Sequence, residues 1–286
     1  MFCSHVPRPT SYVHPPLAVI LRFTAAMITR RLIEGSLELE RRYTHVRGFR
    51  IRSLQAGAGP PLVLLHGLAG SHRWWRYVIP GFARNRRVIV PELVGFGGSR
   101  PAPRQPDMAE MAEIVDEWLL ANGLERTDLV GHSMGGEIAI HLASARPERI
   151  RRLVLVAAAG IPRELSASAA AQLATELARL RAWGRRTFVA TIAADTLRAG
   201  PFTLYRTLRH LLADDVRPLL PLVVQPTLVV WGEHDPVTPL RDAHVLRNSL
   251  PRARLFVVAR ASHNVMADQP DEFVRVVRAF LEEDDA

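Results

Sequence analysis

The residues Gly131-His132-Ser133-Met134-Gly135-Gly136 stand between a short apolar run, Leu129–Val130, and a segment of helical periodicity, Gly135–Arg146. A Gly-x-Ser-x-Gly pattern between a strand and a helix predicts a very tight turn, because side chains two residues before and after the serine would collide there. Such a turn holds the serine in a strained backbone conformation with its hydroxyl exposed. It also places the hydroxyl at a helix N-terminus, where free N–H groups stabilise developing negative charge. This setting favours a nucleophile over a purely structural turn.

A serine hydroxyl is a poor nucleophile unless a base takes its proton, so the motif predicts a histidine and an acid elsewhere in the chain. Of the eleven histidines, His263 is the best candidate, because it lies in the loop between the last expected strand and the last expected helix. Asp235 is the best candidate for the acid, because it begins a loop after a buried strand. Its rivals are Glu233, expected to be a surface charge, and Asp242, expected to face solvent. The chain order Ser133, Asp235, His263 fits a serine placed on this kind of turn.

A glycine-rich loop, Leu64–Gly70, leaves another expected strand. It is predicted to face the serine, so that the backbone N–H groups of Leu68 and Met134 form a hole for an oxyanion. The alternative is a tight strand-to-helix connection without a chemical role. His66 and His132 lie in these turns and are expected to support them.

Short β-branched runs alternate with helical segments along most of the chain, which predicts an α/β fold with parallel strands and crossover helices. Eight strands are expected, at Leu37–Val46, Phe49–Ala56, Leu62–Leu65, Val88–Val90, Leu129–Val130, Leu153–Val156, Leu228–Trp231 and Leu255–Val258. Residues 161–221 show no strand pattern and predict a helical lid inserted before the last two strands. The expected organisation is a core of residues 37–160 and 222–286, the lid 161–221, and an N-terminal extension 1–36. Residues 1–26 are proline-rich and lack periodicity, and Met27 is an alternative start.

The composition limits the classes of function. The net charge of +9 comes from arginine alone and is spread along the chain, which fits a coding bias better than a nucleic-acid-binding surface. With the single cysteine Cys3, no intramolecular disulfide can form, and a reducing, cytoplasmic location is expected. No apolar run is long enough to span a membrane. No zinc or dinucleotide motif is present, so neither a metal nor a cofactor is expected.

These motifs resemble those of the α/β-hydrolase superfamily, in its capped, single-domain bacterial branch. The resemblance runs from about Leu37 to the C-terminus and rests on His66-Gly67, Gly95–Ser99, Gly131–Gly136, Gly232–Pro239 and Ser262-His263-Asn264. It implies a mostly parallel eight-stranded sheet flanked by helices. The chain departs from the family at Glu92, where an aspartate is usual; that position is structural in most members.

The resemblance also implies a serine hydrolase that cleaves a carboxylic ester or lactone, a small molecule with an apolar acyl part, through an acyl-enzyme. Apolar side chains of the lid and of the hole region are candidates for the substrate pocket, namely Trp74, Phe188, Phe202 and Tyr205. Two alternatives are open: carbon–carbon hydrolysis or a perhydrolase reaction on the same triad, and a ligand-binding receptor. Carbon–carbon hydrolases of this fold typically carry Trp after the catalytic histidine, where this chain has Asn264. The oligomeric state is left open.

Overall fold

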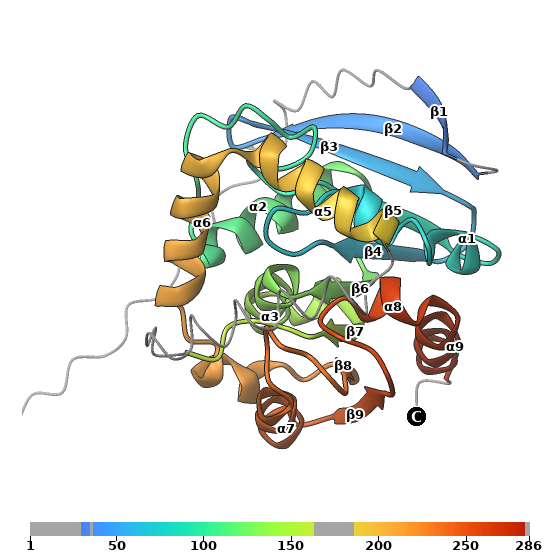
Figure 1. Cartoon of the computed structure of the whole chain (residues 1–286), viewed down its shortest axis with the longest axis vertical. Coiled ribbons are helices and arrows are strands. Elements are labelled where there is room, and N and C mark those ends of the chain that lie inside the picture. Colours follow the sequence, from blue (N-terminus) through green and yellow to red (C-terminus); the bar gives the residue numbers. More distant parts are fainter. Residues whose placement is uncertain (1–29, 35–36, 163–185, 284–286) are drawn as a thin grey trace, which may run out of the picture.

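The computed structural model describes residues 30–34, 37–162 and 186–283, and within them the strands form one twisted sheet (Figure 1). The sheet order is β1-β2-β3-β5-β4-β6-β7-β8-β9. The strands are β1 (Arg30–Glu34), β2 (Leu37–Val46), β3 (Phe49–Ala56), β4 (Pro61–Leu65), β5 (Arg87–Pro91), β6 (Thr127–His132), β7 (Ile150–Val156), β8 (Thr227–Gly232) and β9 (Ala253–Val258). From β5 to β9 neighbouring strands are parallel, which confirms the expected α/β-hydrolase fold.

The first three strands are antiparallel. β2 and β3 are joined at Arg47-Gly48, where both residues have positive φ (48° and 79°), as a two-residue hairpin turn requires. The eight expected strands are present. β1 was not expected: it pairs with β2 inside the segment that the sequence assigned to an extension.

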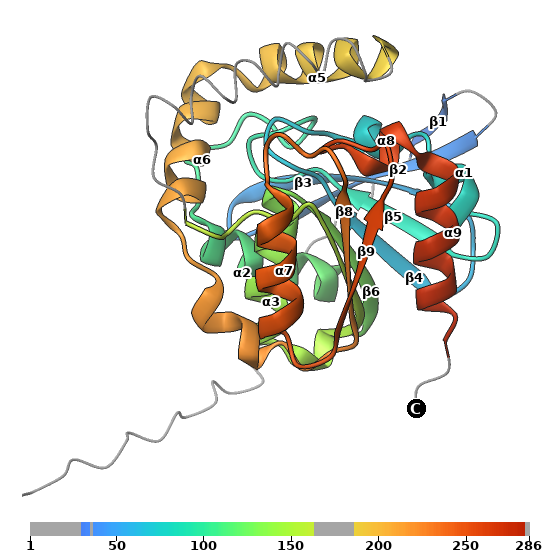
Figure 2. The ribbon, with the colours of Figure 1, turned by 60° about the horizontal axis from the view of Figure 1, so that its bottom comes forward.

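Helices cover both faces of the sheet, which is why the parallel strands are apolar on both sides. They are α1 (Ile79–Phe82), α2 (Met108–Ala121), α3 (Met134–Ala145), α5 (Arg186–Ala199), α6 (Pro201–Ala213), α7 (Leu240–Ser249), α8 (Val265–Asp268) and α9 (Pro270–Leu281), with 3-10 turns η2 (His72–Trp75), η3 (Pro147–Arg149) and η4 (Arg217–Leu222). One core lies between the sheet and α2, α3 and α7; the other lies beneath α1 and α9 (Figures 1 and 2).

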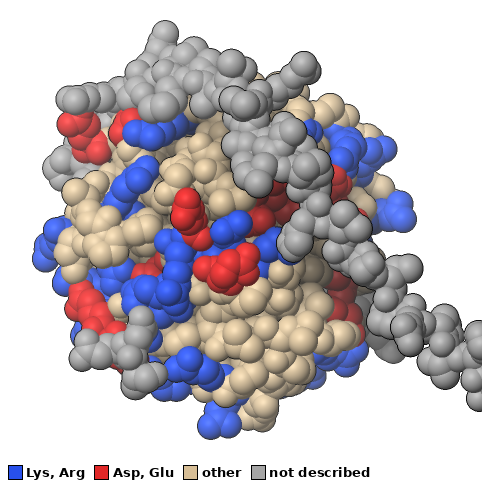
Figure 3. Space-filling view, turned by 180° about the vertical axis from the view of Figure 1, so that it is seen from behind, with Lys and Arg blue, Asp and Glu red and all other residues tan. Residues whose placement is uncertain are grey.

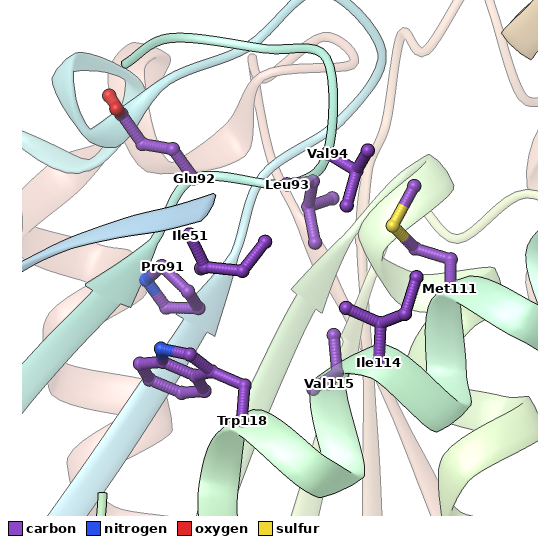
Figure 4. Close-up of a pocket in the computed structure, with 9 residues that line it drawn as sticks. All are labelled: Ile51, Pro91, Glu92, Leu93, Val94, Met111, Ile114, Val115 and Trp118. Atoms are coloured by element: carbon purple, nitrogen blue, oxygen red, sulfur yellow. The ribbon is translucent and has the colours of Figure 1, made fainter. Parts of the chain in front are cut away.

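The packing beneath α2 is tight. Asp107 caps the helix by accepting the N–H of Glu110 at 2.8 Å. Apolar side chains at helical spacing then face β3 and β5, namely Met108, Met111, Ile114, Val115 and Trp118. They leave a cavity of only about 10 Å³ (Figure 4), at the lower limit for one water molecule. We therefore regard this gap as a packing defect and not as a ligand site.

Helices α5 and α6 lie in the part of the expected lid that the structure describes, and η4 follows them at its end; residues 163–185 lie outside the described residues. Helices α5 and α6 lie over the sheet edge where the parallel strands end (Figure 2), and α5 packs against η2. Ligands of open α/β sheets bind at that edge. None of the described helices is long and apolar enough to cross a membrane.

Candidate active site

The turn that carries Ser133 has the strained geometry that its sequence predicts. Ser133 has φ 53° and ψ −118° and precedes the first turn of α3. A Cβ on Gly131 would lie 2.4 Å from the carbonyl oxygen of Gly135, and one on Gly135 would lie 2.4 Å from that of Leu65. Glycine is therefore required at both positions, and the serine side chain is left partly exposed at the strand end.

Asp235 and His263 form a hydrogen-bonded pair in the loops after β8 and β9. Nδ1 of His263 lies 2.9 Å from Oδ2 of Asp235. The other oxygen, Oδ1, accepts the N–H groups of Val237 and Thr238, each at 2.8 Å. Burial alone would raise the pKa of Asp235, but His263 and Thr238 lower it, so the group is a carboxylate. Because a carboxylate only accepts, the Nδ1 atom of His263 carries the proton and Nε2 is left as the basic nitrogen.

Thr238 is a member of this site that the sequence analysis missed. Its hydroxyl lies 2.7 Å from Oδ2 of Asp235 and donates to it. The hydroxyl oxygen of Thr238 also lies 3.2 Å from Nδ1 of His263. Thr238 therefore holds both partners of the pair. The signal in the sequence was its place three residues after Asp235, where a hydroxyl can close back on a carboxylate.

His132 connects the serine turn to the histidine loop. Its Nε2 donates to the carbonyl oxygen of His263 at 3.0 Å, and the two rings lie 4.8 Å apart. Burial and the neighbouring His263 lower the pKa of His132 to about 3, so the ring is neutral. Since Ser133 follows His132 directly in the chain, the serine turn is adjacent to the loop that carries His263.

The glycine-rich loop after β4 is pressed against the serine turn. A Cβ on Gly67 would lie 3.0 Å from Nδ1 of His132 and 3.2 Å from Cβ of Ser133. Buried His66 fixes this loop: its Nε2 accepts the N–H of Leu93 at 3.0 Å, so its Nδ1 donates to the Gly67 carbonyl oxygen at 2.8 Å.

The two predicted oxyanion donors lie in these turns. Within the described residues, the backbone N–H groups of Leu68 and Met134 donate no hydrogen bond to a protein atom. Free donors beside a partly exposed serine are suited to an oxyanion.

Glu92, the departure from the family pattern, supports the loops around the site. It is fully buried and accepts hydrogen bonds from Arg52 at 2.5 and 2.8 Å, from His72 Nδ1 at 2.7 Å and from the N–H of Gly98 at 2.6 Å. Burial alone would raise the pKa of Glu92, but the hydrogen bonds from His72 and Arg52 bring this pKa well below its usual range. The longer side chain thus ties β3, η2 and the loop after β5 together as a carboxylate.

The four predicted pocket residues divide into two pairs. Trp74 and Phe188 are buried with ring centroids 5.8 Å apart, and Trp74 lies 5.8 Å from His132. Phe202 and Tyr205 lie instead on the outer face of α6, 66% and 61% exposed. This corrects the prediction that these two rings line the pocket.

Polar contacts hold α5 on the core beside Trp74. Asp195, buried on α5, accepts the Ser71 hydroxyl at 2.7 Å and also pairs with Arg73. Nearby, the hydroxyls of Tyr77 and Thr187 lie 2.7 Å apart. A hollow of about 370 Å³ opens at the other end of α5, lined by Gly95, Arg100, Pro101, Ala102, Ala199 and Thr203.

Asp242 was expected to face solvent, but it is buried in the first turn of α7, with its carboxylate 3.8 Å from the guanidinium of Arg241. Glu233 is exposed as expected and accepts the N–H of Arg260 at 3.0 Å. The described residues contain no cluster of three or more His, Cys, Asp or Glu side chains that could hold a metal ion.

Glu137, one turn after Ser133, gives a prediction about pH and stability. Burial and the neighbouring Asp214 raise its pKa from 4.5 to about 10, so the folded protein keeps a proton that the unfolded chain releases. Stability therefore falls as pH rises from 4.5 toward 10. Glu137→Gln should reduce this loss, by up to about 4 kcal/mol between about pH 6 and pH 9. Urea unfolding at both pH values checks this; equal slopes for wild type and variant would contradict it.

Comparison with known proteins shows that this chain is similar to hydrolases. The family model described as alpha/beta hydrolase fold matches residues 60–213, and one described as TAP-like protein matches residues 214–285. The 2-hydroxymuconate semialdehyde hydrolase of Pseudomonas sp. (strain CF600) is 32% identical over 278 residues, covering 84% of this chain and 93% of that protein. The pimeloyl-[acyl-carrier protein] methyl ester esterase of Nitrosomonas europaea (strain ATCC 19718 / CIP 103999 / KCTC 2705 / NBRC 14298) is 31% identical over 242 residues, covering 76% and 94%. A solved structure, Est816, an N-acyl homoserine lactone degrading enzyme, superposes with a TM-score of 0.74 at 25% identity, covering 83% and 99%.

Proposed function

Because this chain belongs to the α/β-hydrolase fold family, we propose that it cleaves a carboxylic ester or lactone with an apolar acyl part, using Ser133, Asp235 and His263. The observation that carries the proposal is the carboxylate of Asp235, which accepts four hydrogen bonds. Its four donors leave it no other orientation, so it holds His263 with Nδ1 protonated and Nε2 basic. The strained serine turn lies beside this histidine, through His132.

The proposed reaction follows from these positions. His263 takes the proton of Ser133 as the hydroxyl oxygen attacks the carbonyl carbon, and Asp235 stabilises the imidazolium that results. The N–H groups of Leu68 and Met134 bind the oxyanion. His263 then gives its proton to the leaving alcohol, and water attacks the acyl-enzyme with the same histidine as base. Trp74 and Phe188 provide an apolar wall near the serine turn.

Carbon–carbon hydrolysis is the second candidate, because the 32% identical relative is named a 2-hydroxymuconate semialdehyde hydrolase. Asn264 follows His263 in this chain, where such enzymes typically carry Trp. The methyl ester esterase is 31% identical, and the lactone-degrading enzyme shares the fold at 25% identity. We therefore favour ester or lactone hydrolysis.

A substrate panel tests the proposal. It compares kcat/KM for p-nitrophenyl acetate, butyrate and octanoate, a set of γ- and δ-lactones, and a 2-hydroxy-6-oxo-dienoate. We expect turnover of esters or lactones and a much lower value for the dienoate. The reverse order would replace the ester proposal with carbon–carbon hydrolysis. A stoichiometric release of product without turnover would indicate a receptor.

Thr238 gives a further prediction for this reaction. Thr238→Val removes one donor from Asp235, and a hydrogen bond to a charged group contributes roughly 1.5–3 kcal/mol, so kcat should fall roughly 10- to 100-fold. The loss should appear in kcat, with KM within a few-fold of wild type, because Thr238 holds Asp235 and His263 in place. Thr238→Ser keeps the hydroxyl and is the matched control. A lower melting temperature with an unchanged kcat would reduce Thr238 to a structural role.

A further inference from the structure

We propose that the outer face of α6, together with the end of α5, is a docking surface for an anionic lipid bilayer. Such a surface is independent of which bond the enzyme cleaves. Four side chains of α6 stand at the spacing i, i+3, i+4 and i+7, namely Phe202, Tyr205, Arg206 and Arg209. Residues at this spacing share one helix face, and all four are exposed.

The opposite face of α6 is the one turned toward the protein. Thr207 is fully buried there, and Leu204 and Leu211 pack against the core that includes α2 and α3. The exposed rings of Phe202 and Tyr205 therefore do not belong to the face of α6 that packs on the core. They form a second apolar surface on the opposite face of this helix, and an exposed apolar surface of this kind is typical of an interaction site.

Exposed apolar side chains are concentrated on this lid. Among the described residues, nine large hydrophobic side chains are exposed, and four of them are Leu197, Phe202, Tyr205 and Leu208. Leu197, at the end of α5, is the most exposed of the nine at 82%. Aromatic and aliphatic side chains grouped in this way are those that enter the boundary between headgroups and acyl chains.

The charge of the same segment is entirely positive. Between Asp195 and Asp214 the sequence has no acidic residue, but it has Arg198, Arg206 and Arg209, all exposed. On the face opposite to that of Figure 1, by contrast, acidic and basic side chains are interspersed (Figure 3). A uniformly cationic, apolar surface complements phosphate headgroups.

The arginines and the rings lie in contact. The Arg206 guanidinium lies 4.3 Å from the Phe202 ring centroid, and that of Arg209 lies 6.0 Å from the Tyr205 centroid. Cation–π contacts partly cover the rings in water. At a bilayer, the guanidinium groups would bind phosphates while the rings enter the interface. A second copy of the chain fits this face poorly, because it would bring the same arginines together.

Co-sedimentation with large unilamellar vesicles tests the proposal on the full-length protein. The vesicles are phosphatidylcholine alone, or phosphatidylcholine mixed with phosphatidylglycerol. We expect binding to the mixed vesicles only, weakened by salt. Arg206→Gln with Arg209→Gln should weaken binding roughly 30-fold, from the contribution of two surface arginines. At high salt the apolar contribution to vesicle binding remains. Under that condition Phe202→Ser with Tyr205→Ser should weaken vesicle binding at least as much as the two arginine substitutions do.

The matched control is Arg241→Gln with Arg275→Gln, two exposed arginines on α7 and α9. It lowers the net charge equally and should leave vesicle binding within about twofold of wild type. Melting temperatures establish that each variant is folded. Equal losses in the control and the α6 variants, or no binding by the wild type, would overturn the proposal. A dimer in light scattering that Phe202→Ser with Tyr205→Ser dissociates would assign the face to a second copy instead.

Discussion

Ser133→Ala should abolish ester turnover while the protein stays folded, with kcat reduced on the order of 10⁶. The reason is the position of Ser133, held at φ 53° with its side chain partly exposed between Gly131 and Gly135. Alanine keeps the Cβ and the backbone strain and removes only the oxygen that would attack the carbonyl. The p-nitrophenol release rate on the best ester of the panel measures the effect.

A matched control for this substitution lies on the same helix. Ser144→Ala removes a hydroxyl that donates to the carbonyl oxygen of His141 at 3.0 Å, away from the proposed chemistry. It should leave kcat unchanged, and both variants should melt near the wild-type temperature. If Ser133→Ala kept more than a few per cent of wild-type activity, the nucleophile would have to be another group.

The residues that the sequence located best are those whose roles depend on local backbone geometry. The serine turn, Gly131–Gly136, could be predicted because a strand-turn-helix change within six residues requires glycine at Gly131 and Gly135, and the structure shows the collisions that explain why. Asp235 and His263 could be placed because the carboxyl ends of parallel strands meet at one sheet edge. Their mutual distance of 2.9 Å adds the geometry that the sequence could only imply.

The features that the sequence missed depend on tertiary context. Phe202 and Tyr205 are predicted to line a pocket because they are apolar side chains of the expected lid, whereas their helix buries its other face. Asp242 is buried although a charge near a helix start is usually solvated. β1 is an edge strand, and its pairing with β2 is a contact that a pattern within one short segment does not indicate.

Asp235→Asn should lower kcat by roughly 10⁴, because of the four donors around this carboxylate. In the variant, the amide oxygen would accept the N–H groups of Val237 and Thr238, which now bond Oδ1 at 2.8 Å. The amide NH₂ would then face His263 and donate to its Nδ1. The imidazole would carry its proton on Nε2, toward Ser133, and could no longer act as the base.

Two acids near Asp235 serve as controls for that substitution. Glu233→Gln changes an exposed side chain that accepts the N–H of Arg260 and lies 3.6 Å from Nε2 of His234, so kcat should stay within a few-fold of wild type. Asp242→Asn should also keep kcat, although its burial makes a lower melting temperature expected. Rates for all three variants on one ester, with melting temperatures, separate loss of chemistry from loss of structure. A similar fall in kcat for all three would mean that the acid of the triad is not Asp235. A large fall for Asp235→Asn alone, with an unchanged melting temperature, is the result that the hydrogen bonds around this carboxylate predict.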